Sequence, residues 1–168
     1  MKHIISICLL LCMLLPGCGF KESMKAPVSF YYLRTDLERE QHLVIDSEER
    51  EAHGHIDDLN YLVLLYLRGP ANEDLYSPFP SSVTLERLTH IHDTLHITLG
   101  GIDFSQQVPL DATLSCACLA KTCFALSNVT CVRINTLAGQ EAGQQDIIIH
   151  SDSLILWDQA PIPTEAIE

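Results

Sequence analysis

Hydrophobic residues form three kinds of pattern along this chain: one continuous apolar run near the start, short stretches typical of strands, and two stretches with the period of a helix. Residues 28–34 are rich in aromatic and branched side chains and predict a strand. A second extended segment is expected at 42–45. The charged stretch 48–55 is expected to form a loop.

The first helical stretch has clear ends, because Asp57 or Asp58 can cap its N-terminus and Gly69-Pro70 stops it. Its main apolar face repeats at helical spacing and consists of Leu59, Leu62, Val63, Tyr66 and Leu67. A second apolar stripe lies on another side of this helix and consists of Tyr61, Leu64 and Leu65. This stripe is either covered by the end of the chain or free to bind a partner protein, and it is the candidate interaction surface.

The middle of the chain predicts a hairpin, a second helix and a strand. Residues 83–91 and 95–99 form the expected hairpin around 92–94. Asp111 is expected to cap the second helix, which runs to about Leu126. A strand is expected to follow at 129–134.

After this strand, the Gly/Gln-rich residues 137–145 predict a linker. Residues 145–158 predict a C-terminal β-hairpin with strands at 146–149 and 154–157, and residues 159–168 predict a disordered tail. Two helices among these strands predict an α+β two-layer sandwich whose sheet is mixed or antiparallel. Whether the last hairpin joins that sheet is left open by the pattern.

The apolar run at 4–15 is shorter than the roughly 20 residues that cross a membrane, so residues 1–17 predict a signal peptide. Leu15, Pro16, Gly17 and Cys18 resemble a bacterial lipobox. The resemblance implies that Cys18 carries a lipid, that residues 18–27 form a tether, and that the protein is anchored to the cell membrane on its extracytoplasmic face. The alternative is an ordinary secretory signal with an incidental cysteine.

Composition and motifs argue against several classes of function. The chain has 168 residues with 47% hydrophobic positions, which suits one folded domain. Its 22 acidic and 10 basic residues give a net charge of -12, and this surface repels nucleic acids. No G-x-S-x-G, H-E-x-x-H or P-loop spacing occurs in the sequence. We therefore expect a protein that is not an enzyme, with no catalytic residue, metal or cofactor.

An ordered series of features across residues 28–136 resembles the GerMN domain, the sporulation and spore germination domain of bacterial envelope proteins. A helix ends in Leu67-Arg68-Gly69-Pro70, a loop at 75–80 ends in Phe79-Pro80, and a hairpin starts with Val83-Thr84-Leu85. A second helix at 115–126 then leads into Val132-Arg133-Ile134. The resemblance implies a lipoprotein that holds envelope complexes together without catalysis, in sporulation or germination, with an envelope protein or a second copy of itself as partner.

Four cysteines follow the signal, Cys116, Cys118, Cys123 and Cys131, at C-x-C-x4-C-x7-C spacing. On a helix Cys116 and Cys123 share a face, whereas Cys118 lies about 200° from Cys116. The three therefore diverge too far for one metal or a 116–118 disulfide. Small core residues are the preferred interpretation; a metal site or a disulfide through Cys131 are the alternatives.

The histidines also suggest a metal site. His90, His92 and His96 lie on the expected hairpin, with His90 and His92 on one side and Ile91, Leu95, Ile97 and Leu99 forming the apolar face. A solvated outer face is the preferred interpretation of these residues, and likewise of His53-Gly54-His55 in the charged loop.

The sequence is compatible with two functions. The first is a membrane-tethered module that binds an envelope protein through Tyr61, Leu64 and Leu65. The alternative is a module that binds a cell-wall glycan or a small solute. Aromatic residues that could stack on sugars are Tyr31, Tyr32, Tyr76, Phe79 and Trp157.

Overall fold

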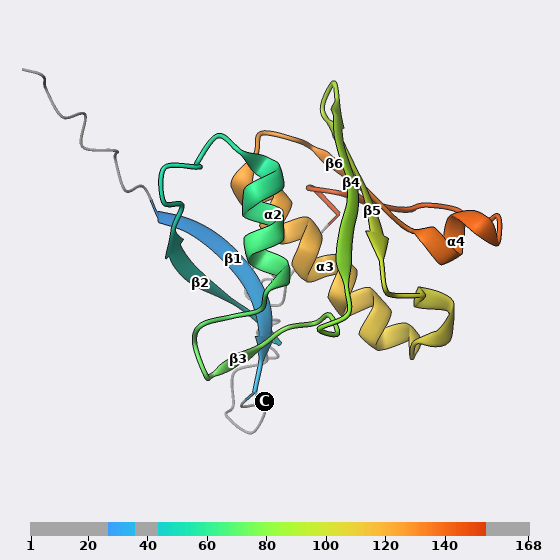
Figure 1. The fold of residues 1–168 in the computed structure, drawn as a ribbon, viewed down its shortest axis with the longest axis horizontal. Helices are drawn as coiled ribbons and strands as arrows, with labels where there is room; N and C mark the ends of the chain where they lie inside the picture. The colour runs from blue at the N-terminus through green and yellow to red at the C-terminus, as the bar shows by residue number, and fades with distance from the viewer. Residues whose placement is uncertain (1–26, 36–43, 154–168) are drawn as a thin grey trace, which may run out of the picture.

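A computed structural model describes residues 27–35 and 44–153 of the chain. The strands are β1 (Pro27–Arg34), β2 (Ile45–Glu51), β3 (Leu75–Tyr76), β4 (Thr84–Ile91), β5 (Thr94–Gly100), β6 (Cys131–Thr136) and β7 (Ile147–His150). The helices are α2 (Leu59–Leu67), the short 3-10 helix η1 (Phe104–Gln106), α3 (Pro109–Leu126) and α4 (Leu137–Glu141). The strands form a three-stranded sheet of order β2-β1-β3 and a four-stranded sheet of order β4-β5-β6-β7 (Figure 1). The predicted α+β sandwich is confirmed.

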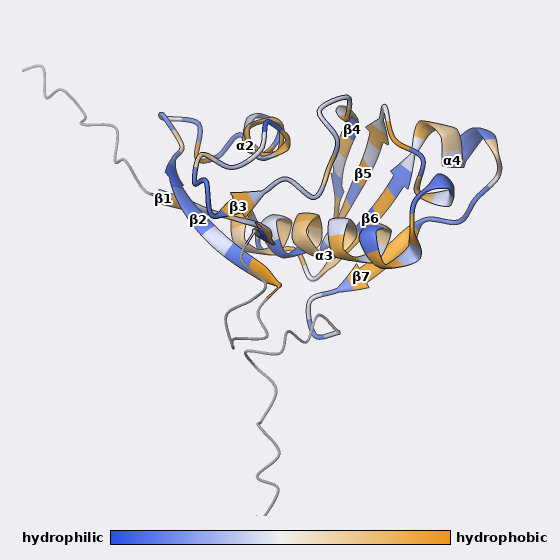
Figure 2. Ribbon diagram, turned by 90° about the horizontal axis from the view of Figure 1, so that it is seen from below, coloured by the Kyte–Doolittle hydropathy of each residue, from blue (hydrophilic) through white to orange (hydrophobic). Residues whose placement is uncertain are grey.

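Helix α3 connects the two sheets. It packs against β1 of the first sheet and against β6 and β7 of the second, and Figure 2 shows it extending from one sheet to the other. Helix α2 packs against β4 and α3. One continuous hydrophobic core results, with fully buried side chains from both sheets and both long helices: Phe30, Tyr32, Leu62, Val63, Tyr66, Leu95, Ile97, Leu99, Leu119, Val132 and Ile134.

Strand β1 is confirmed where the sequence predicted it, and it pairs antiparallel with β2 and β3. The expectation of a loop at 48–55 is wrong, because β2 continues to Glu51 and is mostly hydrophilic (Figure 2). Its polar residues form a strand because seven consecutive positions pair with β1, among them Glu48 with Phe30. Pairing with a buried neighbour outweighs the weak strand preference of charged residues.

Helix α2 has the predicted ends. The Asp58 carboxylate accepts a 3.0 Å hydrogen bond from the Tyr61 amide and caps the N-terminus. At the other end Gly69 has a φ of +91°, the left-handed conformation that glycine adopts without strain after a helix. The Gly69 amide donates a 3.0 Å hydrogen bond to the Tyr66 carbonyl.

The predicted hairpin is formed by β4 and β5, and β5 then pairs in parallel with β6 through a connection that contains η1 and α3. Strand β7 pairs antiparallel with β6, so the first strand of the predicted C-terminal hairpin joins the four-stranded sheet. The strand predicted at 154–157 and the tail predicted at 159–168 lie outside the described residues, as do the predicted signal peptide, Cys18 and most of the predicted tether.

Two expectations about the second half of the chain are wrong. Asp111 does not cap α3; the helix begins at Pro109, which needs no amide partner in the first turn, and Asp111 lies within that turn. Part of the expected linker at 137–145 is the helix α4. It forms because the Thr136 hydroxyl accepts a 2.9 Å hydrogen bond from the Gly139 amide and caps its first turn.

Candidate functional site

The α2 surface, defined by Tyr61, Leu64 and Leu65, is only partly open. Leu64 is 46% exposed in the middle of α2, whereas Leu65 is half-buried against the core. The Tyr61 ring stacks on His55 with the ring centroids 4.2 Å apart. Of the three predicted residues, Leu64 is therefore the one that presents an apolar side chain to solvent.

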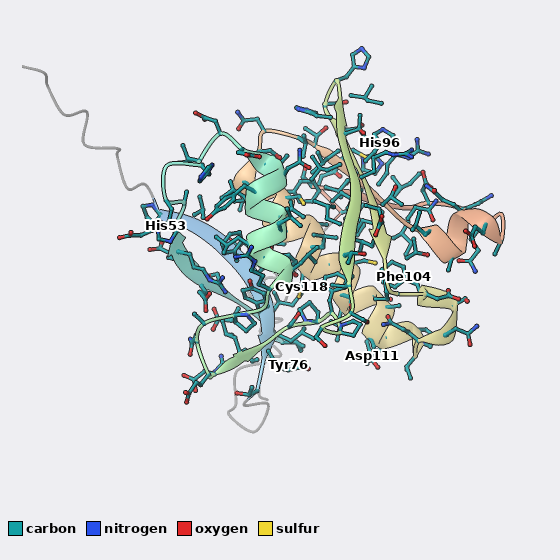
Figure 3. The ribbon with its side chains drawn as sticks, in the orientation of Figure 1. His53, Tyr76, His96, Phe104, Asp111 and Cys118 are labelled. Carbon is teal, nitrogen blue, oxygen red and sulfur yellow. The ribbon has the colours of Figure 1, made fainter. Side chains whose placement is uncertain are left out.

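The aromatic residues considered for sugar binding do not gather on one surface. Tyr32 and Phe79 are buried, and the Tyr31 ring is covered by Lys121, whose Nζ lies 4.6 Å from the ring centroid. Tyr76 is exposed on β3, at the lower left of Figure 3. Trp157 lies outside the described residues. Tyr76 is thus the one member of this set, among the described residues, whose ring is exposed.

The four described cysteines are free and buried, which confirms the interpretation of Cys116 and Cys123 as core residues. Cys118 lies outside the main core cluster, in a second small cluster with Leu33 and Ile45 between α3 and the first sheet. Burial raises the pKa of Cys116, Cys118 and Cys123 to about 12. A thiol with such a pKa is a poor nucleophile at neutral pH.

The histidines are spread over the surface. His92 is the first residue of the turn after β4 and has a φ of 56°, so the strand alternation stops before it and the expected alignment with His90 is wrong. Ile91 is 48% exposed rather than part of the apolar face, because it pairs with Thr94 on the side of the sheet that carries His96. His53 lies at the far end of the molecule from His96 (Figure 3). Within 27–35 and 44–153, no three His, Cys, Asp or Glu side chains are placed to hold a metal ion.

A polar hollow of about 200 Å³ lies on the outer face of the four-stranded sheet, and we call it the β4–β6 hollow. Two rows of paired residues cross three strands at its floor. One row is Thr89, His96 and Arg133; the other is Arg87, Thr98 and Asn135. Gln140 of α4 and Asp146 stand at its margin, and Ile91 and Ile97 add apolar atoms.

Hydrogen bonds fix part of this lining. Asn135 donates from Nδ2 to Asp146 Oδ1, and Gln140 Nε2 makes a longer, weaker contact of 3.5 Å with the Thr98 hydroxyl. Arg133 Nε lies 3.5 Å from Asp146 Oδ2. This nitrogen is buried and has no hydrogen-bond partner.

Sequence reasoning missed this hollow. It placed His96 on an outer face, which is correct for that residue, but it gave no neighbour to His96. Arg133 becomes that neighbour only through the parallel pairing of β5 with β6. The available signal was the alternation of polar residues at every second position in β5 and in the middle of β6.

No family model matches the chain, and no curated protein matches it. Among solved structures, the chain is similar to a candidate lipoprotein from Clostridium perfringens, with 13% sequence identity and a TM-score of 0.47 over 77% of this chain and 91% of that chain. At this identity and TM-score the similarity assigns neither a family nor a function. Within the described ranges, no helix is long and apolar enough to cross a membrane. The resemblance to the GerMN domain stays a prediction.

Proposed function

We propose that this chain is a lipid-anchored lipoprotein of the cell envelope, without catalytic activity, whose folded domain binds another envelope protein. The lipobox-like residues Leu15 to Cys18 support the anchor. The order of helix, Gly-Pro end, hairpin, second helix and strand agrees with the element order that the GerMN resemblance implies. A role in sporulation or germination is the finer form of this proposal and depends on that resemblance.

The single observation that supports partner binding is the exposure of Leu64. Its neighbours Leu62 and Val63 are completely buried, yet Leu64 stands 46% exposed in the middle of the same helix. Full burial of a leucine side chain contributes about 1.5–3 kcal/mol, so burying the exposed part of Leu64 in an interface would contribute about 1 kcal/mol. Half-buried Tyr61 and Leu65 flank it and would extend the contact. A protein partner with an apolar patch suits this surface better than a sugar does.

Fatty-acid labelling of cells tests the anchor. The wild-type chain is expected to incorporate labelled fatty acid, and the Cys18→Ala variant is expected to incorporate none. Equal labelling of both chains would contradict the anchor.

Crosslinking in intact cells tests the partner. Leu64→Asp places a charge in the proposed interface and is expected to abolish the crosslinked product while the melting temperature stays within a few degrees. The matched control is Leu110→Asp, since Leu110 is 65% exposed in the first turn of α3. Retention of the product by Leu64→Asp, or its loss in both variants, would contradict the proposed surface. Sedimentation of the purified chain distinguishes a second copy from a different protein.

A further inference from the structure

We infer that the β4–β6 hollow is a binding site for an oxyanion, a carboxylate or phosphate group held between Arg87 and Arg133. This inference goes beyond the proposed function, because the hollow lies on the four-stranded sheet and the α2 surface does not contribute to it. The charge of the lining, the incomplete pairing of Arg133 and the size of the hollow support this inference.

Charge comes first. The chain has more than twice as many acidic as basic residues, yet the hollow has two arginines and one carboxylate, Asp146, in its lining. Arg87 makes no ion pair with any described residue. A planar guanidinium matches the geometry of carboxylate and phosphate oxygens, and two of them facing one hollow favour an anion.

The guanidinium of Arg133 is incompletely paired at its Nε atom. This atom is enclosed and has no hydrogen-bond partner among the described residues, whereas the Arg133 side chain as a whole is 40% exposed. Asp146 does not satisfy it, because 3.5 Å is longer than the roughly 2.7–2.9 Å of a charge-assisted hydrogen bond. The other oxygen of Asp146 already accepts from Asn135. The exposed part of the Arg133 guanidinium is therefore left for the oxygens of a bound anion to contact at the hollow.

The rest of the lining suits the same ligand. His96 lies between Thr89 and Arg133 in one row of the sheet, and Thr98 offers a hydroxyl in the other. A volume of about 200 Å³ holds a small acid or the acidic end of a larger molecule. It is below the roughly 300 Å³ at which pockets begin to enclose drug-sized ligands. A metal cation is disfavoured because Asp146 is the one carboxylate in the lining.

Nuclear magnetic resonance of the full chain in detergent tests the inference. The probes are inorganic phosphate and succinate, each titrated against sodium chloride at equal ionic strength. The Nε–H signal of Arg133 is expected to shift and to saturate with at least one probe, and the responding probe identifies the oxyanion. Arg87→Gln is expected to weaken this binding at least about tenfold, as the loss of a charged hydrogen bond predicts.

Control variants distinguish a specific anion site from the general attraction of anions to arginine side chains. Arg68→Gln removes an exposed arginine at the end of α2 and is expected to leave the titration unchanged. Arg133→Lys keeps the charge but loses the planar fork, and it is expected to bind more weakly than wild type with an unchanged melting temperature. Leu64→Asp is expected to bind normally, so failure of the partner proposal does not affect this one. Absence of a saturable shift with both probes, or an equal loss in Arg68→Gln and Arg87→Gln, would overturn the inference.

Discussion

The Tyr32 hydroxyl donates a 3.0 Å hydrogen bond to the main-chain carbonyl of Tyr66, and the two rings stack with their centroids 4.9 Å apart. This pair joins the middle of β1 to the end of α2. The Tyr66 hydroxyl differs, because it is buried without a hydrogen-bond partner. Burial raises the pKa of Tyr66 well above its usual value, and the neighbouring Thr122 acts in the opposite direction. No hydrogen bond of normal geometry joins the Tyr66 hydroxyl to Thr122.

The two tyrosines therefore predict opposite responses to the same substitution. Tyr32→Phe removes the hydrogen bond to the Tyr66 carbonyl and the longer, 3.4 Å one that the Tyr32 hydroxyl accepts from Arg50, and it is expected to lower the free energy of unfolding by about 1 kcal/mol. Tyr66→Phe removes a buried, unpaired hydroxyl and is expected to leave the free energy of unfolding unchanged or to raise it. Urea unfolding at neutral pH measures both. An equal loss in the two variants would show that the Tyr66 hydroxyl has a partner.

A second group of contacts holds the loop after α2 on β2. The Glu48 carboxylate accepts from the amides of Ala71 and Asn72 at 2.9 and 2.7 Å and from the Arg50 side chain. Arg50 also donates to the Gly69 carbonyl, and both side chains are largely buried. Because a largely buried ion pair depends on both partners, removing one of them leaves an uncompensated charge.

Arg50→Met is therefore expected to lower the free energy of unfolding by about 3 kcal/mol. The double variant Glu48→Gln with Arg50→Met is expected to lose less than the sum of the two single losses, because both variants break the same interaction. Glu49→Gln on the exposed side of β2 is the control and is expected to change stability by less than about 0.5 kcal/mol. Additive losses in the double variant would contradict the coupling.

These contacts explain which elements the sequence predicted. Helix α2 was predicted correctly because its signals are local: the cap at Asp58 and the glycine at 69 lie within its own segment. Strand β2 was missed because Glu48 and Arg50 bind main-chain groups near residue 70, and no local pattern shows this.

The candidate sites also differ in whether a local sequence pattern could predict them. The burial of Cys116 and Cys123 followed from helical spacing alone. The β4–β6 hollow did not follow from any local pattern. His96 lies beside Arg133 only because β5 pairs in parallel with β6, and α3 separates these two strands in the sequence. Helix α4 was also missed, since Gly139 lowers helix preference and its compensation is a cap from Thr136.

The buried thiols predict a clear chemical behaviour. With pKa values raised to about 12, Cys116, Cys118 and Cys123 are almost fully protonated at pH 8. A thiol-reactive probe is expected to label these three slowly in the folded chain and rapidly in urea. Mass spectrometry of labelled peptides distinguishes them from Cys131. Fast labelling of Cys123 in the folded chain would contradict its burial.

The same pKa values predict a loss of stability in alkali. The folded chain holds the thiol protons more tightly than the unfolded chain, whose thiols have the ordinary value of 9.0. Below pH 9 both states are protonated, so the contribution is complete; between pH 9 and 12 it falls as the pH rises, by roughly 1 kcal/mol per pH unit for each thiol. Unfolding by urea at pH 8 and pH 10.5 measures the slope. Cys123→Ala is expected to have a smaller slope than wild type, and an equal slope would contradict this assignment.

The turn between β4 and β5 holds His92 in a strained backbone conformation that a glycine would relieve. His92 has a φ of 56° at the first of the two turn positions, where glycine is the preferred residue when only that position has a positive φ. A residue with a Cβ loses about 1–2 kcal/mol in this conformation, whereas glycine adds about 0.5–1 kcal/mol of chain entropy to the unfolded state. His92→Gly is therefore expected to raise the free energy of unfolding by about 0.5 kcal/mol. The control is His90→Gly, in the extended part of β4, which is expected to lower it by about 0.5–1 kcal/mol. If both variants shift the urea midpoint downwards by the same amount, the turn carries no strain at His92 and its side chain stabilises the hairpin instead.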